Sequence, residues 1–264
     1  MAEAARPLWF VSDVHLTPAR PQRTARFLAF LRDRVASRDA DLVIAGDLFD
    51  WWWGSKPVPA DVGEVIDALE ALPGSVLWME GNHDVFVGRG LTEDSPLATT
   101  AEPLEIGRAA PFATIHVAHG DLVDPAERGY RRFRALLRGI PGRAAARLVG
   151  PRVTRAVGGF AASGSRSAKG GVDGYEGLSD RWLAAARSYA ASTGADLCVL
   201  GHGHWLGWWP GLVCLGDWLR WSSYARLDSG GLGLWRYRED GDELLLDAPR
   251  GAVEFEAAAS SKAG

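Results

Sequence analysis

Short apolar runs alternate with longer segments of helical periodicity over the first half of the chain. Residues 21–38 and 62–72 have helical spacing, and Val62, Val65 and Leu69 fall on one face of the second segment. Pro73 and Gly74 follow directly and are typical of a helix end. This alternation predicts a layered α/β core. The predicted buried strands are residues 8–11, 41–45, 76–79 and 114–118.

The pattern changes after residue 121, where two helical segments interrupt it. Residues 127–138 and 143–160 form these segments, and the first carries Phe133 and Leu137 on its apolar face. A loop rich in glycine and serine then spans residues 163–174. We therefore predict a single domain of residues 1–256 with a helical cap insert at about 125–178, and a disordered tail at 257–264. A predicted helix at 179–193 leads back to predicted strands at 197–200, 212–215, 224–227 and 232–237.

The charge of the chain is distributed unevenly. The whole sequence of 264 residues has a formal net charge of -4, but residues 128–169 contain ten Arg, one Lys and no acidic residue. Subtracting this +11 from the total leaves -15 for the rest of the chain. A basic segment in an acidic chain points to an anionic partner, although it is also compatible with a solvated face of a helical hairpin.

Cysteine content and hydropathy indicate the compartment. Cys198 and Cys214 lie within apolar runs, which favours buried free thiols in a reducing cytosol over a disulfide or a metal site. The N-terminal segment lacks the pattern of a signal peptide, and no run approaches the ~20 apolar residues that span a bilayer. We therefore expect a cytoplasmic protein.

Polar clusters follow five of the predicted strands. Asp13 and His15 are two residues apart, so at the end of an extended strand their side chains point to the same side, and His202 and His204 repeat this spacing. Ligand sites in open α/β sheets lie at such strand ends. The candidate metal ligands are Asp13, His15, Asp47, Asn82, His119, His202 and His204.

This set offers four imidazoles, two carboxylates and one amide oxygen, which is too many for one four-coordinate zinc ion. It fits two ions about 3.5–4 Å apart that share a carboxylate. Mn, Fe and Zn all suit ligands of this kind, which contain no thiolate. His116 alternates with Ile115 and Val117 and is predicted to be structural, whereas Asp121 is either a partner of a metal ligand or a turn residue.

The ordered blocks resemble those of the calcineurin-like metallophosphoesterases, which carry Asp-x-His, Gly-Asp, Gly-Asn-His-Asp, His and Gly-His-x-His. The resemblance implies a four-layer αββα sandwich with the metals at the sheet ends. It also implies that His83 acts beside the metals as a catalytic residue and that Asp84 orients it. By matched position, Asp13, His15, Asp47 and His204 would hold one ion, and Asp47, Asn82, His119 and His202 the other.

The segments beside these blocks narrow the resemblance. Residues 48–53, 122–125 and 215–218 are similar to those of the UDP-2,3-diacylglucosamine pyrophosphohydrolases of lipid A synthesis. That family releases UMP and 2,3-diacylglucosamine 1-phosphate, uses Mn²⁺ and works at the cytoplasmic face of the inner membrane, and its insert takes up the acyl chains. The resemblance thus implies a lipid-linked nucleotide as substrate and an anionic membrane surface as partner. The implied substrate contacts are Asn82, Glu127, Tyr130, Ser165 and Lys169.

Two positions differ within that family. One branch has Arg where this chain has His83, and one has Asp where this chain has Glu127. The alternative function is a phosphodiesterase or phosphatase that acts on a soluble nucleotide. A scaffold without activity is disfavoured because every ligand position is filled, and nucleic acid is disfavoured because no recognised binding motif is present. No obligate protein partner is evident.

The three consecutive residues Trp51, Trp52 and Trp53 follow a ligand block. They cannot all point inward from one element, so we expect one or two of them to line the site or to contact lipid.

Overall fold

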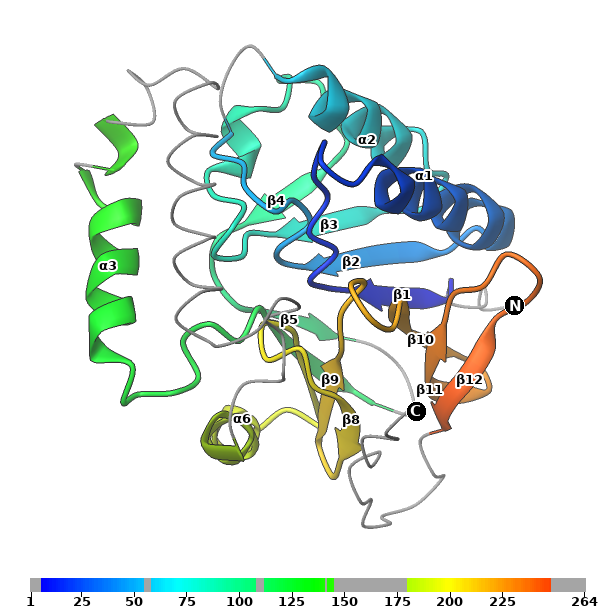
Figure 1. The fold of residues 1–264 in the computed structure, drawn as a ribbon. Helices are drawn as coiled ribbons and strands as arrows, with labels where there is room; N and C mark the ends of the chain where they lie inside the picture. The colour runs from blue at the N-terminus through cyan, green and yellow to red at the C-terminus, as the bar shows by residue number, and fades with distance from the viewer. Residues whose placement is uncertain (1–5, 55–57, 108–111, 141, 145–179, 248–264) are drawn as a thin grey trace, which may run out of the picture.

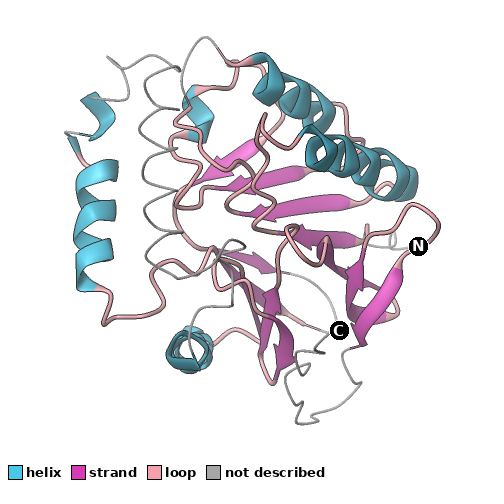
Figure 2. Cartoon of the chain, in the orientation of Figure 1, coloured by secondary structure: helices cyan, strands magenta, loops and turns pink. Residues whose placement is uncertain are grey.

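Two stacked sheets form the centre of the molecule, with helices on their outer faces (Figures 1 and 2). The computed structural model describes residues 6–54, 58–107, 112–140, 142–144 and 180–247. Three predicted segments lie wholly or almost wholly outside the described residues: the second helix of the insert (143–160), the Gly/Ser-rich loop (163–174) and the C-terminal tail (257–264).

The first sheet has the strand order β12-β11-β10-β1-β2-β3-β4. In this sheet, β1 to β4 are parallel to one another, and β10 pairs antiparallel with β1. The parallel half brings the carboxyl ends of three predicted strands to one edge. The strands are β1 (Leu8–Val11), β2 (Asp41–Ala45), β3 (Val76–Met79), β4 (Ala98–Thr100), β10 (Ser223–Asp228), β11 (Gly231–Arg236) and β12 (Glu243–Asp247).

The second sheet has the order β5-β6-β7-β9-β8. β6, β7 and β9 are parallel, and β5 and β8 close the edges as antiparallel strands. Its strands are β5 (Leu104–Gly107), β6 (Thr114–Ala118), β7 (Leu197–Leu200), β8 (Leu206–Trp209) and β9 (Leu212–Leu215).

The helices cover both outer faces. α1 (Pro21–Phe30) begins with Pro21, whose fixed φ suits a first helical turn, and it runs on through π and 3-10 turns to Arg38. Asp39 ends this segment in the left-handed region at φ 48°. α2 (Ala60–Glu70) packs beside α1, whereas α6 (Asp180–Thr193) packs on the second sheet. A short 3-10 turn, Val87–Arg89, follows β3.

The core consists of three layers of side chains between these elements. On β1, Trp9 faces α1 and stacks on Tyr224 with ring centroids 4.7 Å apart, whereas Phe10 faces the second sheet. Trp182 of α6 closes the outer face of the second sheet together with Cys198 and Cys214. The alternation along β1 thus separates two apolar layers and confirms the predicted αββα sandwich.

The insert is described in part, as α3 (Arg128–Arg138). α3 stands at the side of the sandwich (Figure 1), and none of its residues is buried. Phe133, Leu136 and Ile140 are 53%, 59% and 85% exposed. Within the described parts of the chain, no helix is both long enough and apolar enough to cross a membrane.

Candidate dimetal centre

The predicted ligands lie directly after the carboxyl ends of five parallel strands. β1, β2 and β3 end at the same edge as β6 and β7 of the facing sheet, so residues from distant parts of the chain meet there. The structure brings all seven predicted metal ligands together. Asp13 and His15 follow β1, Asp47 follows β2, Asn82 follows β3, His119 follows β6, and His202 and His204 follow β7.

The backbone turns sharply at these positions. Asp13, His15, Asp47, His202 and His204 all adopt positive φ between 51° and 59°. A non-glycine residue in the left-handed region costs on the order of 1–3 kcal/mol and occurs mostly at functional sites. Five such residues in one cluster indicate a backbone that is held in place to present side chains.

One group of ligand atoms gathers around Asp13. Asp13 Oδ1 lies 3.5 Å from His204 Nε2 and 3.8 Å from His15 Nε2. These separations are too long for hydrogen bonds, but they suit two ligands that share one ion, because metal–ligand distances of about 2.1 Å place neighbouring ligand atoms about 3–4 Å apart. Asp13 Oδ1 is fully buried and accepts no hydrogen bond from the described residues.

A second group gathers around Asp47. Asp47 Oδ2 lies 3.5 Å from His119 Nε2, and Asn82 Oδ1 lies 2.9 Å from His119 Nε2 and 2.8 Å from His202 Nδ1. The same Asp47 oxygen is 3.9 Å from His15 Nε2 of the first group. Asp47 therefore stands between the two groups, as a bridging carboxylate must.

The protein holds Asp13, Asp47 and His119 by the side-chain atom that does not face the centre. Asp13 uses Oδ2 to accept from Ser12 Oγ at 2.6 Å, and Asp47 uses Oδ1 to accept from the His83 amide at 2.8 Å. His119 Nδ1 contacts the Ala45 carbonyl at 2.9 Å. Such outer hydrogen bonds fix the orientation of ligands. The residues present therefore fit two divalent ions.

Glycines allow the ligand loops to approach one another. A Cβ on Gly81 would lie 2.0 Å from Asp47 Oδ1, and one on Gly201 would lie 1.9 Å from Ser12 Oγ. The glycines of the Gly-Asn-His-Asp and Gly-His-x-His blocks are thus required by close approach.

The electrostatics of the cluster call for cations. Burial opposes charge on Asp47, but His119, His83 and His15 hold the pKa of its carboxyl well below its usual value. Burial would lower the pKa of His119, yet the charge of Asp47 raises it to about 10. Burial and the charge of His119 together lower the pKa of His202 to about 3. Without metal, a proton on His119 neutralises the negative charge of Asp47. A bound divalent ion would take over this role, so metal binding should release the proton.

His83 and Asp84 occupy different surroundings. His83 Nδ1 lies 2.5 Å from the Asp50 carbonyl oxygen, and the ring meets that of His15 edge-on at 4.9 Å. Asp84 is buried and accepts from four donors: the amides of Asp47, Leu48 and Gly81 and the indole of Trp78. The Asp50 carbonyl is a described partner of the His83 ring, and the role in orienting His83 that the family resemblance implied for Asp84 stays a prediction. Asp84 holds the loops that carry Asp47 and Asn82.

A pocket of about 210 Å³ opens beside the centre. Trp51 lines it, whereas Trp52 is buried and packs against Trp78, which agrees with the expectation that the three tryptophans cannot all point inward. The pocket extends from Asn82 and His83 to α3. Five residues of α3 line it: Tyr130, Phe133, Arg134, Leu137 and Arg138.

The predicted substrate contacts fall in different places. Asn82 and Tyr130 line the pocket, and the Tyr130 hydroxyl donates to Asp121 at 2.6 Å. Glu127 stands at the N-cap position of α3 without a side-chain capping hydrogen bond, and Ser165 and Lys169 lie outside the described residues.

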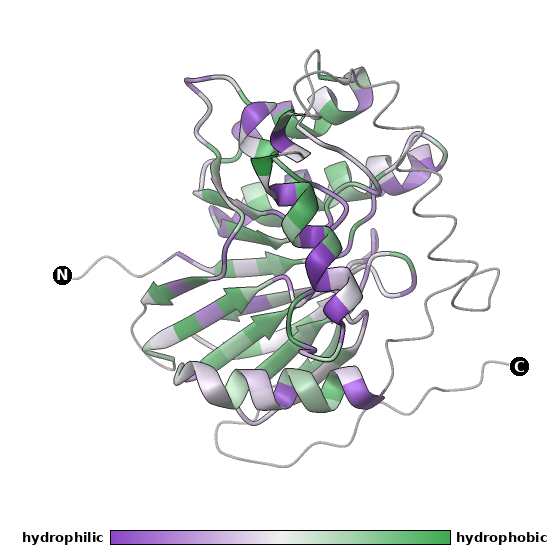
Figure 3. Ribbon diagram, turned by 90° about the vertical axis from the view of Figure 1, so that its left-hand side faces the viewer, coloured by the Kyte–Doolittle hydropathy of each residue, from purple (hydrophilic) through white to green (hydrophobic). Residues whose placement is uncertain are grey.

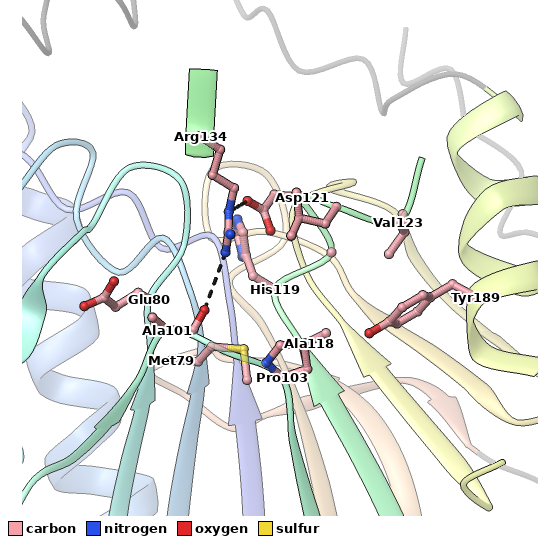
Figure 4. Close-up of a pocket in the computed structure, with 12 residues that line it drawn as sticks. Met79, Glu80, Ala101, Pro103, Ala118, His119, Asp121, Val123, Arg134 and Tyr189 are labelled. Atoms are coloured by element: carbon pink, nitrogen blue, oxygen red, sulfur yellow. Dashed lines mark hydrogen bonds and ion pairs between the residues drawn. The ribbon is translucent and has the colours of Figure 1, made fainter. Parts of the chain in front are cut away.

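The sequence also singled out Asp121 and His116. Asp121 is buried beside His119 (Figure 4), and its carboxylate accepts hydrogen bonds from Tyr130 and Arg134 of α3. His116 Nε2 lies 2.9 Å from the Tyr189 hydroxyl and takes no part in the described metal clusters, as predicted.

Sequence reasoning missed several residues that support the centre. Asp217 is fully buried and lies 3.1 Å from His204 Nδ1, and Glu80 is buried and pairs with Arg138. Asp217 stands in a Leu-Gly-Asp-Trp segment after a strand, which is the same signal that revealed the ligands. Glu80 and Arg138 are 58 positions apart, and the sequence contains no signal that pairs them.

Residues 6–206 match the family model of the calcineurin-like phosphoesterases. Among curated relatives, a UDP-2,3-diacylglucosamine hydrolase of Xanthomonas oryzae pv. oryzae (strain PXO99A) is 32% identical over 248 residues, which cover 86% of this chain and 98% of that protein. One of the same name from Stenotrophomonas maltophilia (strain K279a) is 32% identical and covers 85% and 96%. Among solved structures, a Vps29 double mutant from Entamoeba histolytica has 15% identity and a TM-score of 0.46, covering 95% and 99%.

Proposed function

Because the chain belongs to the calcineurin-like phosphoesterases, whose members are metal-dependent phosphoester hydrolases, we propose that it hydrolyses the pyrophosphate bond of UDP-2,3-diacylglucosamine. The products would be UMP and 2,3-diacylglucosamine 1-phosphate, within lipid A synthesis. The single observation that carries the proposal is the complete dimetal ligand set beside a pocket with a partly apolar wall. The names of the curated relatives, at 32–33% identity over most of both chains, support the choice of substrate.

Asp13, His15, Asp47 and His204 would hold one ion, and Asp47, Asn82, His119 and His202 the other. Bound divalent ions polarise phosphoryl oxygens and lower the pKa of a bound water. We propose Mn²⁺ for both, because the resemblance to the UDP-2,3-diacylglucosamine pyrophosphohydrolases implies it and the imidazole, carboxylate and amide ligands suit it.

His83 supplies the proton in this proposal. A carbonyl oxygen can only accept, so Nδ1 carries the hydrogen that lies toward the Asp50 carbonyl. When the ring is doubly protonated, its opposite nitrogen can donate to the oxygen that leaves phosphorus. His83 lines the pocket and is only partly buried, so a substrate can reach it.

Phe133 and Leu137 provide the apolar wall that an acyl chain needs, because burial of each CH₂ contributes about 0.8 kcal/mol. The outer side of the same helix exposes Leu136 and Arg132 to solvent. Exposed apolar and cationic residues on one helix suit the surface of an anionic membrane. We therefore place the protein on the cytoplasmic side of the inner membrane, bound peripherally.

The test is hydrolysis of UDP-2,3-diacylglucosamine in detergent by the Mn²⁺-loaded protein, with release of UMP as the readout. We expect the Asp47→Ala variant to lose activity because the bridging ligand is absent. Replacing Phe133 and Leu137 by serine should weaken turnover of the lipid and leave a soluble diester almost unaffected. Turnover of soluble diesters without release of UMP would instead identify a phosphodiesterase or phosphatase that acts on soluble nucleotides.

A further inference from the structure

α3 meets the rest of the protein with polar rather than apolar side chains. Figure 3 looks onto the side of the molecule on which α3 lies. Tyr130, Arg134 and Arg138 are spaced by four residues, so they project from one face of the helix. Each of them hydrogen bonds to the sandwich, whereas Leu136 and Ile140 are exposed. An ordinary surface helix is bound through its apolar face, so the attachment of α3 requires another explanation.

Arg138 provides the first attachment. One guanidinium nitrogen pairs with the Glu80 carboxylate, and another donates to the Gly81 carbonyl at 2.8 Å. Glu80 is buried and also accepts from the Val87 amide at 2.9 Å. Arg138 therefore holds the peptide that immediately precedes the metal ligand Asn82.

Arg134 provides the second attachment. Its Nε donates to Asp121 at 2.6 Å, and its Nη2 reaches the Ala101 carbonyl at 3.5 Å. Figure 4 shows this side chain extending from α3 toward Asp121, with His119 beside it. The carboxylate of Asp121 is buried and also accepts from Tyr130. Asp121 lies two residues after the ligand His119, just as Glu80 lies two residues before Asn82.

We propose that Arg134 and Arg138 form a two-point clamp that fixes α3 against the metal-ligand loops and thereby sets the preference for a substrate with long apolar groups. The two arginines are positioning residues. Phe133 directly precedes Arg134 and Leu137 directly precedes Arg138, so the clamp determines where the apolar wall of the pocket stands. A small diester needs the metals but not this wall. The substrate part of the inference rests on the proposed function.

Both acceptors of the clamp are buried carboxylates. Removing either arginine leaves a buried charge without its partner, which favours separation of α3 from the sandwich. Displacement of a binding wall by about 1 Å can reduce turnover by up to about 100-fold.

The test uses Arg138→Gln and Arg134→Gln in the full-length Mn²⁺-loaded protein. We expect kcat/KM for UDP-2,3-diacylglucosamine to fall by roughly 10- to 100-fold, mostly through KM, and kcat/KM for bis(p-nitrophenyl) phosphate to fall by no more than about threefold. Arg187→Gln is the control for loss of an exposed arginine, because Arg187 is exposed on α6 and does not line the pocket, and it should behave as wild type. Arg138→Lys, which keeps the charge but loses the two-donor fork, should be intermediate.

Amide hydrogen exchange tests the clamp without any substrate. The amides of residues 131–138 should exchange at least about tenfold faster in Arg134→Gln and Arg138→Gln than in wild type and Arg187→Gln. Equal losses with both substrates would overturn the inference, because they would assign the arginines to the metal centre itself. Unchanged exchange in α3 would overturn it as well. If wild type fails to hydrolyse the lipid but the variants still release α3, the proposed function fails and the clamp stands.

Discussion

Asp217 offers a direct way to test how His204 is held. The residue is fully buried, and its Oδ2 lies 3.1 Å from His204 Nδ1 and 3.0 Å from Arg220 Nη2. Burial would raise the pKa of Asp217, but the hydrogen bond to His204 and the charges of His204 and Arg220 hold it below its usual value. The ionised carboxylate thus fixes Nδ1 as a donor, which leaves His204 Nε2 for an ion. Asp217→Ala removes this constraint.

The size of the effect follows from the contacts that are lost. Loss of a carboxylate that orients a metal-binding histidine typically weakens metal binding by about 10–100-fold, or about 1.4–2.7 kcal/mol. The protein also loses the hydrogen bond from the Arg220 amide to Asp217 Oδ1 at 2.7 Å, and hydrogen bonds to charged groups contribute about 1.5–3 kcal/mol. The Arg220 side chain is 39% exposed, so its ion pair adds at most about 1 kcal/mol.

The assay is competition for Mn²⁺ with a fluorescent chelator, together with thermal unfolding of the metal-free protein. We expect weaker binding of one of the two ions and a Tm lowered by about 3–16 °C, given about 2–4 °C per kcal/mol in domains near this size. Arg220→Gln is the control, since it removes the ion pair but keeps the contact between Asp217 and His204. Unchanged affinity for both ions in Asp217→Ala, despite lower stability, would refute the positioning role.

Three further predictions follow from other contacts. Asp84→Asn should lower both the Tm and the metal content, because the Leu48 amide and the Trp78 indole would lose the oxygen that accepts their hydrogen bonds. A decrease in kcat alone would instead favour a role of Asp84 in orienting His83. Gly81→Ala should reduce turnover by about 100-fold or more with the fold intact by circular dichroism, because its Cβ would displace Asp47; normal turnover would contradict this. Burial raises the pKa of Cys198 to about 12, so iodoacetamide at pH 8 should leave the native thiols unmodified, with reaction appearing only as pH approaches 12 or on unfolding; rapid labelling by mass spectrometry at pH 8 would refute this.

The central strands were predictable because each one carries its own signal. A run such as residues 41–45 is buried on both faces in a parallel sheet, so nearly every position is apolar. The edge strands β4, β5, β8 and β12 were not predicted. β4 has three residues, all at least partly exposed, and its pairing with β3 rather than its own composition makes it a strand.

The cap helix shows the limits of periodicity. The spacing of Phe133 and Leu137 correctly predicted a helix near residues 127–138, and it gave that helix an apolar face. The structure instead binds α3 through Arg134 and Arg138, because buried carboxylates at the sheet edge attract cations. The position of those carboxylates depends on two different sheets and could not be obtained from the helix itself.

The sequence by itself determined the order of the layers and the seven candidate ligands, because strand signals and the residues that follow strands are local in the chain. Only the tertiary structure decided which atom of each ligand faces the centre, that Asp47 stands between the two groups, and that Asp217 and the clamp arginines support them. The reason is physical: hydrogen bonds and charge pairs form between atoms that are close in space, and at this edge the partners come from strands far apart in the sequence.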